Sequence, residues 1–205
     1  MNLPNKLTLL RILLVPVFLV CMYVQFPYHF TAALLVYAAA SITDALDGKI
    51  ARSRNLVTTF GKFADPLADK IRVLAAFAAM ADINQYYIND YYGSHPAFEG
   101  ITHVNGIVVT IIAAREFMVS GLRLVTAEKG VVVAAGIWGK LKTAFTMVTQ
   151  VIILLVLCLM DFHVVLIFNG VVHVTIFALV WISVALTIIS GAVYLKGYWK
   201  YIDMK

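Results

Sequence analysis

Four aspartates between residues 44 and 69 have the residue type and spacing that metal-assisted chemistry requires. Asp44 and Asp47 are three residues apart, and Asp65 and Asp69 are four residues apart. Residues at these separations lie on one face of a helix, so each pair forms a local cluster of carboxylates. Small residues continue both faces and leave room for a polar group near the backbone: Gly48, Ala51 and Gly61.

The acids occur in a chain suited to a bilayer. The 205-residue sequence is 62% apolar, and its mean hydropathy of +0.89 leaves too little polar surface for a water-soluble fold. A charged side chain inside a membrane span costs roughly 2.5–3.5 kcal/mol, so four unpaired carboxylates would cost on the order of 10 kcal/mol. These carboxylates therefore need a partner.

A divalent cation removes both the mutual repulsion and the desolvation cost of such carboxylates. Hard oxygen ligands favour Mg²⁺, and Mn²⁺ also suits them. Four carboxylates can hold two ions about 4 Å apart, an arrangement that clamps the attacking and leaving oxygens of a phosphoryl displacement. The acids thus predict a site with two Mg²⁺ or Mn²⁺ ions.

Membrane carboxylates also form ion or proton pathways, so a divalent-cation transporter is the competing class of function. A single acid could instead cap a helix or extend toward the membrane surface. Four acids at two helical spacings fit these simpler explanations poorly. A transporter would also not need Arg52 beside the acids, whereas a guanidinium there can fork onto a diphosphate.

The elements that position these residues are expected to be helices. The uncharged stretch between Arg11 and Asp44 is too long for one span, and the proline and polar groups of Gln25–His29 interrupt it. Four further spans are predicted over Phe63–Tyr86, Val104–Ala127, Leu141–Met160 and Val171–Leu195. We expect an all-α, polytopic membrane protein with six transmembrane helices, forming a single domain over residues 1–205.

The 16 Lys and Arg residues indicate how these helices are oriented. They cluster at both termini and at the second-to-third and fourth-to-fifth connections, and the other three connections have none. Because positively charged loops stay in the cytoplasm, we expect both termini and both acidic faces on that side. The net charge of +5 is explained by topology and attraction to anionic lipids, and it requires no nucleic-acid partner.

The acidic segment resembles the signature of the CDP-alcohol phosphatidyltransferases. It reads D-x-x-D-G-x-x-A-R from Asp44, then eight residues, then G-x-x-x-D-x-x-x-D from Gly61. The resemblance implies a homodimer of six-helix protomers in the bacterial plasma membrane, with an active site open to the cytoplasm. It also implies a two-metal site formed by Asp44, Asp47, Asp65 and Asp69, with Asp69 as general base.

Further segments are similar to one bacterial branch of this family, the phosphatidylglycerophosphate synthases. They include Asn2–Thr8, Gly61–Lys70, Arg115–Phe117 and Gly139–Thr143. This similarity implies CDP-diacylglycerol as donor and glycerol 3-phosphate as acceptor, although inositol phosphate, serine or phosphatidylglycerol stay open as acceptors. The resemblance implies four donor-binding residues from the family motif: Gly48, Arg52, Thr58 and Gly61. Asn5 and Thr8 are weaker candidates for contact with the nucleotide.

Cations in the fourth and fifth predicted spans support an anionic acceptor independently. Arg115 lies well inside its span and needs an anionic partner, which a substrate phosphate or a neighbouring carboxylate could supply. Glu116 and Arg123 could also pair with each other. The candidate acceptor-binding residues are Arg115, Lys140, Arg123 and Lys142.

Arg72 departs from the family pattern, in which an apolar residue is usual. It shares a helix face with Asp65 and Asp69. Three roles are open: Arg72 pairs with Asp69, contacts the acceptor phosphate, or turns toward another neighbour. A tight pair with Asp69 would weaken that carboxylate as a base.

Overall fold

The computed structural model describes residues 2–53, 58–83, 103–128, 136–162 and 169–199. Within these ranges, the side chains of residues 3, 4, 45–53, 59, 62, 128 and 169 lie outside the description. The elements within these ranges are helices. In chain order they are α1 (Leu3–Tyr23), α2 (His29–Ser53), α3 (Thr59–Asp82), α5 (Gly106–Glu128), α6 (Ile137–Asp161) and α7 (Asn169–Tyr198). This finding confirms the all-α prediction for the described part of the chain.

Polar caps fix where two of the helices begin. The Asn2 side chain accepts a hydrogen bond from the Asn5 amide at 3.2 Å, so α1 already begins at Leu3. Thr58 caps α3 in the same way, because its hydroxyl accepts from the Gly61 amide at 3.0 Å. Each cap satisfies an amide that the helix itself leaves without a partner.

The predicted break after the first span is confirmed. Helix α1 ends at Tyr23, and α2 begins at His29. Tyr28 has a backbone φ of 62°, a left-handed conformation that ends one helix direction before the next begins. Helix α2 then continues through Asp44 to Ser53, so the first half of the acidic motif is helical.

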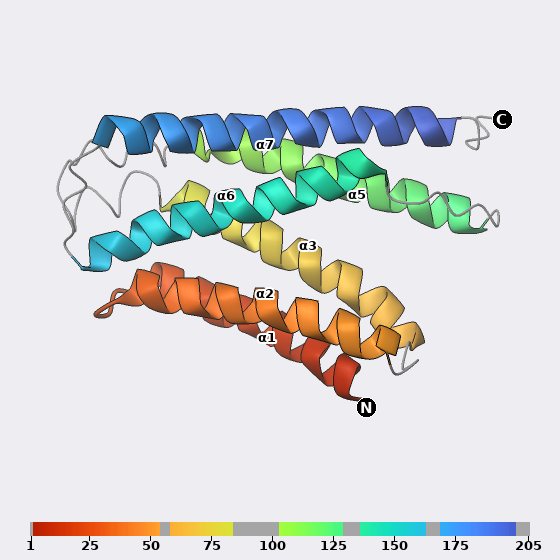
Figure 1. Ribbon diagram of the computed structural model, residues 1–205, viewed down its shortest axis with the longest axis horizontal. Coiled ribbons are helices and arrows are strands. Elements are labelled where there is room, and N and C mark those ends of the chain that lie inside the picture. The colour runs from red at the N-terminus through yellow and green to blue at the C-terminus, as the bar shows by residue number, and fades with distance from the viewer. Residues whose placement is uncertain (1, 54–57, 84–102, 129–135, 163–168, 200–205) are drawn as a thin grey trace. The chain divides into compact units, whose positions relative to one another are not determined.

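The chain divides into two compact units. Unit 1 comprises Met1–Ile83 and Val151–Ile167, and unit 2 comprises Asn84–Gln150 and Phe168–Lys205. In unit 1, α1 packs along α2 and α3, with Met22, Phe30 and Phe77 buried in the core (Figure 1). In unit 2, α5 packs along α7, and Tyr194 and Tyr198 of α7 are buried there with Val119 of α5.

Within the part of the chain that the structure describes, three helices are long and apolar enough to cross a membrane: Asn5–Tyr23 of α1, Ile137–Asp161 of α6 and Gly170–Tyr198 of α7. Large apolar side chains such as Leu13, Val171 and Val174 are exposed on α1 and α7, which suits contact with lipid. Helices α2, α3 and α5 carry the acidic motif and the embedded arginines. Six spans with cytoplasmic termini therefore stay a prediction.

Within unit 1, the C-terminal end of α6 holds the first turn of α2. Asp161 is buried, and its Oδ2 accepts hydrogen bonds from the Thr31 amide at 2.6 Å and the Thr31 hydroxyl at 2.9 Å. The carboxylate therefore acts as a capping group supplied by another helix. Its negative charge also interacts favourably with the positive end of the α2 dipole.

Replacing Asp161 should show how much this cap contributes. Asp161→Ala is expected to lower the free energy of unfolding by about 1–2 kcal/mol, because it leaves the Thr31 amide without its acceptor. Asp161→Asn keeps an acceptor oxygen and should lose less. Thermal unfolding of the purified protein in detergent measures both changes, and equal stability of parent and Asp161→Ala would contradict the capping role.

Candidate active site

Residues from α1 and α3 meet at the start of α3. The Thr58 hydroxyl, which caps α3, donates a hydrogen bond to Asn5 Oδ1 at 2.8 Å. An added Cβ on Gly61 would lie 3.3 Å from Thr58 Oγ1 and 3.4 Å from Asn5 Oδ1. Three of the sequence-predicted donor-binding residues thus lie side by side, and the absence of a side chain at Gly61 is what lets them approach.

One turn further along each helix, Thr8 of α1 contacts the first aspartate of α3. The Thr8 hydroxyl donates to Asp65 Oδ1 at 2.6 Å. The other oxygen, Oδ2, lies 3.6 Å from the position of a Cβ on Gly61. Thr8 therefore fixes one oxygen of Asp65, while the second oxygen borders the space kept open by Gly61.

Asp44 of α2 pairs with an arginine that sequence reasoning did not include in the site. Arg11 Nη1 lies 2.7 Å from Asp44 Oδ1, and the arginine side chain is fully buried whereas that of Asp44 is 36% exposed. The signal in the sequence was a cation at the start of a long apolar run, one turn after Thr8. A buried guanidinium requires an anion, and Asp44 supplies it.

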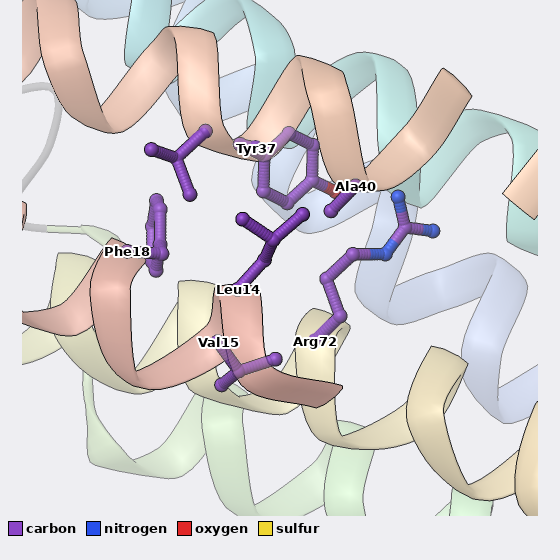
Figure 2. A pocket seen from close by; sticks show the side chains of 7 residues that line it. Leu14, Val15, Phe18, Tyr37, Ala40 and Arg72 are labelled. Carbon is purple, nitrogen blue, oxygen red and sulfur yellow. The ribbon is translucent and has the colours of Figure 1, made fainter. Parts of the chain in front are cut away.

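Arg72 of α3 adopts the first of its three expected roles. Its guanidinium pairs with Asp69 Oδ1 at 2.8 Å and donates to the Ser41 hydroxyl on α2. It also lies over the Tyr37 ring, 5.3 Å from the centroid. Figure 2 shows Arg72 extending along a small, mostly apolar pocket toward Tyr37 and Ala40. These contacts fix Arg72 on the α2 side of Asp69.

The three described carboxylates of the motif lie in the same region of unit 1, although they do not form a group of three metal ligands. Asp44 interacts electrostatically with both Asp65 and Asp69. Asp44 and Asp69 are each about one-third exposed, whereas their partners Arg11 and Arg72 are buried. The acids thus present an open face that is backed by buried cations, and oxygen donors of this kind fit Mg²⁺ or Mn²⁺.

The remaining motif residues lie on the same stretch of α2. Asp47, Gly48 and Arg52 follow Asp44 along the helix, but their side chains are outside the described residues. Among the described side chains, no group of three or more His, Cys, Asp or Glu is arranged as a ready metal cluster. The expected fourth carboxylate, Asp47, is not part of that described set.

A second charged cluster joins the three helices of unit 2. Glu116 of α5 accepts from the neighbouring Arg115 at 3.1 Å and from Lys142 of α6. Arg115 also donates to the Ser190 hydroxyl on α7. Lys142 is buried, whereas Lys140, two residues earlier, is exposed. The carboxylate expected to pair with Arg123 is thus engaged by Arg115 and Lys142.

Tyr194 of α7 contacts two arginines of α5. Its hydroxyl accepts from Arg123 at 2.7 Å, and the Arg115 and Arg123 guanidinium carbons lie 5.6 Å and 5.2 Å from its ring centroid. Two glycines permit this packing: a Cβ on Gly139 would lie 3.1 Å from the Tyr194 hydroxyl, and one on Gly191 would lie 3.1 Å from Arg115 Cγ. Neither Ser190 nor Tyr194 was foreseen, because only the folded chain brings α7 to these arginines.

Comparison with known proteins identifies the family. A family model described as CDP-alcohol phosphatidyltransferase matches residues 1–189. The chain belongs to this family. Members of the CDP-alcohol phosphatidyltransferase family are generally dependent on divalent metals, which agrees with the oxygen donors gathered in unit 1.

Relatives with similar sequences carry more specific names. The chain is 36% identical to a CDP-diacylglycerol–glycerol-3-phosphate 3-phosphatidyltransferase of Bacillus subtilis, over 97% of this chain and 96% of the relative. It is 34% identical to a protein of the same name from Rickettsia felis, over 98% and 97%. A probable phosphatidylglycerophosphate synthase of Mycobacterium tuberculosis is 32% identical, over 94% and 79%.

The close packing around Gly61 gives a direct test of the described geometry. Gly61→Ala is expected to lower the free energy of unfolding by about 1–2 kcal/mol, because crowding against Thr58 and Asn5 outweighs the usual gain in helix propensity. Gly121→Ala is a matched control on α5, since a Cβ there meets nothing within 4 Å. Thermal unfolding should show destabilisation only for Gly61→Ala, and an equal response of the two variants would contradict the packing.

Proposed function

We propose that this protein transfers the phosphatidyl group of CDP-diacylglycerol to glycerol 3-phosphate, giving phosphatidylglycerol phosphate and CMP. The observation that carries the proposal is the convergence of motif carboxylates with Thr8, Thr58 and Gly61 in unit 1. The names of relatives that align over nearly the whole chain support the same donor and acceptor.

The metal site is proposed to consist of Asp44, Asp47, Asp65 and Asp69 with two Mg²⁺ or Mn²⁺ ions. Four carboxylates and two buried arginines give the protein site a net charge of minus two, and two divalent ions reverse its sign. A positive site attracts a diphosphate, which the negative site without metal ions would repel. When bound, the ions supply stabilisation of the negative charge that builds up on the diphosphate.

The nucleotide end of the donor is proposed to lie against the start of α3. Asn5, Thr8 and Thr58 offer polar groups there, and Gly61 leaves the backbone open to close approach. Gly48 and Arg52 belong to the same site through their place in the family motif on α2. The acyl chains of the donor stay in the bilayer, so the reacting phosphorus lies at the membrane boundary.

Asp69 is proposed as the general base. Its carboxylate accepts the proton of the acceptor hydroxyl while that oxygen bonds to the lipid-side phosphorus of CDP-diacylglycerol. The bond from this phosphorus to the bridging oxygen breaks, and CMP departs with that oxygen. Arg72 binds Oδ1 of Asp69 and is itself held by Ser41, so the pair orients the carboxylate. This pair is also the contact expected to make Asp69 a weaker base.

The acceptor phosphate is proposed to bind to the cations of unit 2. Glu116 pairs with both Arg115 and Lys142, and Arg123 donates to the Tyr194 hydroxyl beside them. Among the described side chains, three cations thus lie around one carboxylate, so the cluster has a surplus of positive charge. A surplus of this kind inside a membrane protein favours an anionic ligand. Glu116 engages Arg115 as well as Lys142. Arg115 and Arg123 both lie against the Tyr194 ring, so these two neighbouring arginines are proposed as the principal phosphate ligands. Exposed Lys140 adds to the attraction.

The expected topology is kept as part of the proposal. Six transmembrane helices in one domain over residues 1–205, with both termini and the active site facing the cytoplasm of a bacterial cell, follow from the one-sided Lys and Arg distribution. A homodimer surrounded by membrane lipids is the proposed assembly. This arrangement lets a water-soluble acceptor meet a lipid donor at the membrane surface.

Release of CMP tests the reaction directly. The purified protein in detergent, with CDP-diacylglycerol and Mg²⁺, is expected to release CMP with glycerol 3-phosphate and to form a phosphorylated lipid. Inositol phosphate, serine, phosphatidylglycerol and glycerol are the comparison acceptors, and each should give a rate at least about tenfold lower because it lacks the matched anion or hydroxyl geometry. A faster reaction with one of them would show that the proposed acceptor is wrong. If no acceptor led to release of CMP, the proposed reaction itself would be overturned.

Single Asp→Asn changes separate a metal ligand from the base. Asp69→Asn is expected to reduce kcat by at least about 100-fold, since the amide cannot accept the proton. It should weaken Mg²⁺ binding less than Asp44→Asn does, as measured by titration of activity or calorimetry. Equal loss of Mg²⁺ affinity in both variants would contradict the division of roles.

A further inference from the structure

Two histidines of unit 2 face each other at the ends of two helices. His103 lies just before α5, and His173 lies in the first turns of α7. Their Nε2 atoms are 3.1 Å apart, and their ring centroids are 5.2 Å apart. Both side chains are half-buried, so solvent and small ions reach them. Neither residue takes part in the proposed transfer reaction.

The separation of the two nitrogens suits two ligands of one metal ion. Imidazole nitrogens bind Zn²⁺ at about 2.0–2.1 Å, which places two ligands of a tetrahedral ion roughly 3.3 Å apart. The observed 3.1 Å needs a change of only a few tenths of an ångström. In the absence of an ion, one Nε2 can donate to the other as a hydrogen bond, so the ion replaces a single shared proton.

The neighbouring groups hold His103 in this position. The Phe177 ring, one turn after His173 on α7, packs edge-on against His103 with 4.7 Å between centroids. Two residues after His103, the Asn105 side chain accepts from the Ile107 and Val108 amides at 3.1 Å and so fixes the start of α5. Ligands that are already oriented bind a metal with a smaller entropy cost.

The protonation state also suits a ligand. An imidazole must be neutral to donate its lone pair to a metal. Burial lowers the pKa of His103 below its ordinary value, and the neighbouring His173 lowers it further. At neutral pH His103 is therefore available as a ligand.

We propose that His103 and His173 form a binding site for a transition-metal dication such as Zn²⁺. The two histidines supply two ligands, and water completes the coordination. Imidazole favours Zn²⁺ over Mg²⁺, so this site is chemically different from the carboxylates of unit 1. A bound ion links the turn before α5 to the start of α7 and stabilises that contact within unit 2.

Zinc binding by the whole protein tests the site. The protein is purified without a histidine tag, and calorimetric titration with Zn²⁺ is done in excess Mg²⁺ to occupy the carboxylates. One equivalent is expected to bind to the parent. His103→Gln and His173→Gln should each weaken this binding by more than about tenfold. Removing a residue that only hydrogen-bonds to a metal ligand can already lower metal affinity by about tenfold, so removing a ligand should cost more. His163→Gln is the control and should bind Zn²⁺ as the parent does.

Unchanged Zn²⁺ affinity in both His103→Gln and His173→Gln would overturn the proposal, as would a loss confined to His163→Gln. Thermal unfolding without Zn²⁺ shows whether each variant is folded. A spectroscopic measurement on the parent does not depend on the variants: Cu²⁺ bound in the same position should show two imidazole nitrogens by electron paramagnetic resonance. A parent spectrum without imidazole coupling would also refute the site.

Discussion

The pairing of charges in an apolar environment is the constraint on which this structure depends. Arg11 and Arg72 are buried in unit 1, and each contacts a motif carboxylate whose side chain is about one-third exposed. A lone buried ion costs several kcal/mol, and a partner with further hydrogen bonds offsets much of that cost. The arginines thus allow a group of acids to exist among apolar helices and leave the outer side of those acids for a ligand.

The helices could be predicted from the sequence because apolar length and charge breaks are local properties. In the described part of the chain, six helical segments and the interruption after Tyr23 appear where expected, although the cap at Thr58 starts α3 at Thr59 rather than at the expected Phe63. The candidate acids could also be found, since a helical spacing places Asp65 and Asp69 on one face. The spacing of residues along one helix carries no information about the neighbouring helices. The contacts of Arg11, Ser190 and Tyr194 with the charged residues were therefore not predicted, and the sequence could not decide among the three roles of Arg72.

The two charged clusters have opposite character. The described acids of unit 1 outnumber their buried arginines, whereas the cations of unit 2 outnumber Glu116. Both rely on glycine for close packing: Gly61 beside Thr58 and Asn5, and Gly139 and Gly191 beside Tyr194 and Arg115. The net charge of each cluster decides which ligand it attracts. The lack of a side chain at these glycines decides how closely the polar groups approach one another.

The burial of Arg11 has a consequence for how the protein is made. The first helix leaves the ribosome before α2 exists, so its guanidinium enters the insertion machinery without Asp44. A cation at that depth resists partition into lipid until an anion arrives. We therefore expect Arg11 to stay at the cytoplasmic headgroups until α2 emerges and supplies Asp44. Insertion of the first two helices is in this sense a joint event, completed by one ion pair rather than by hydropathy alone.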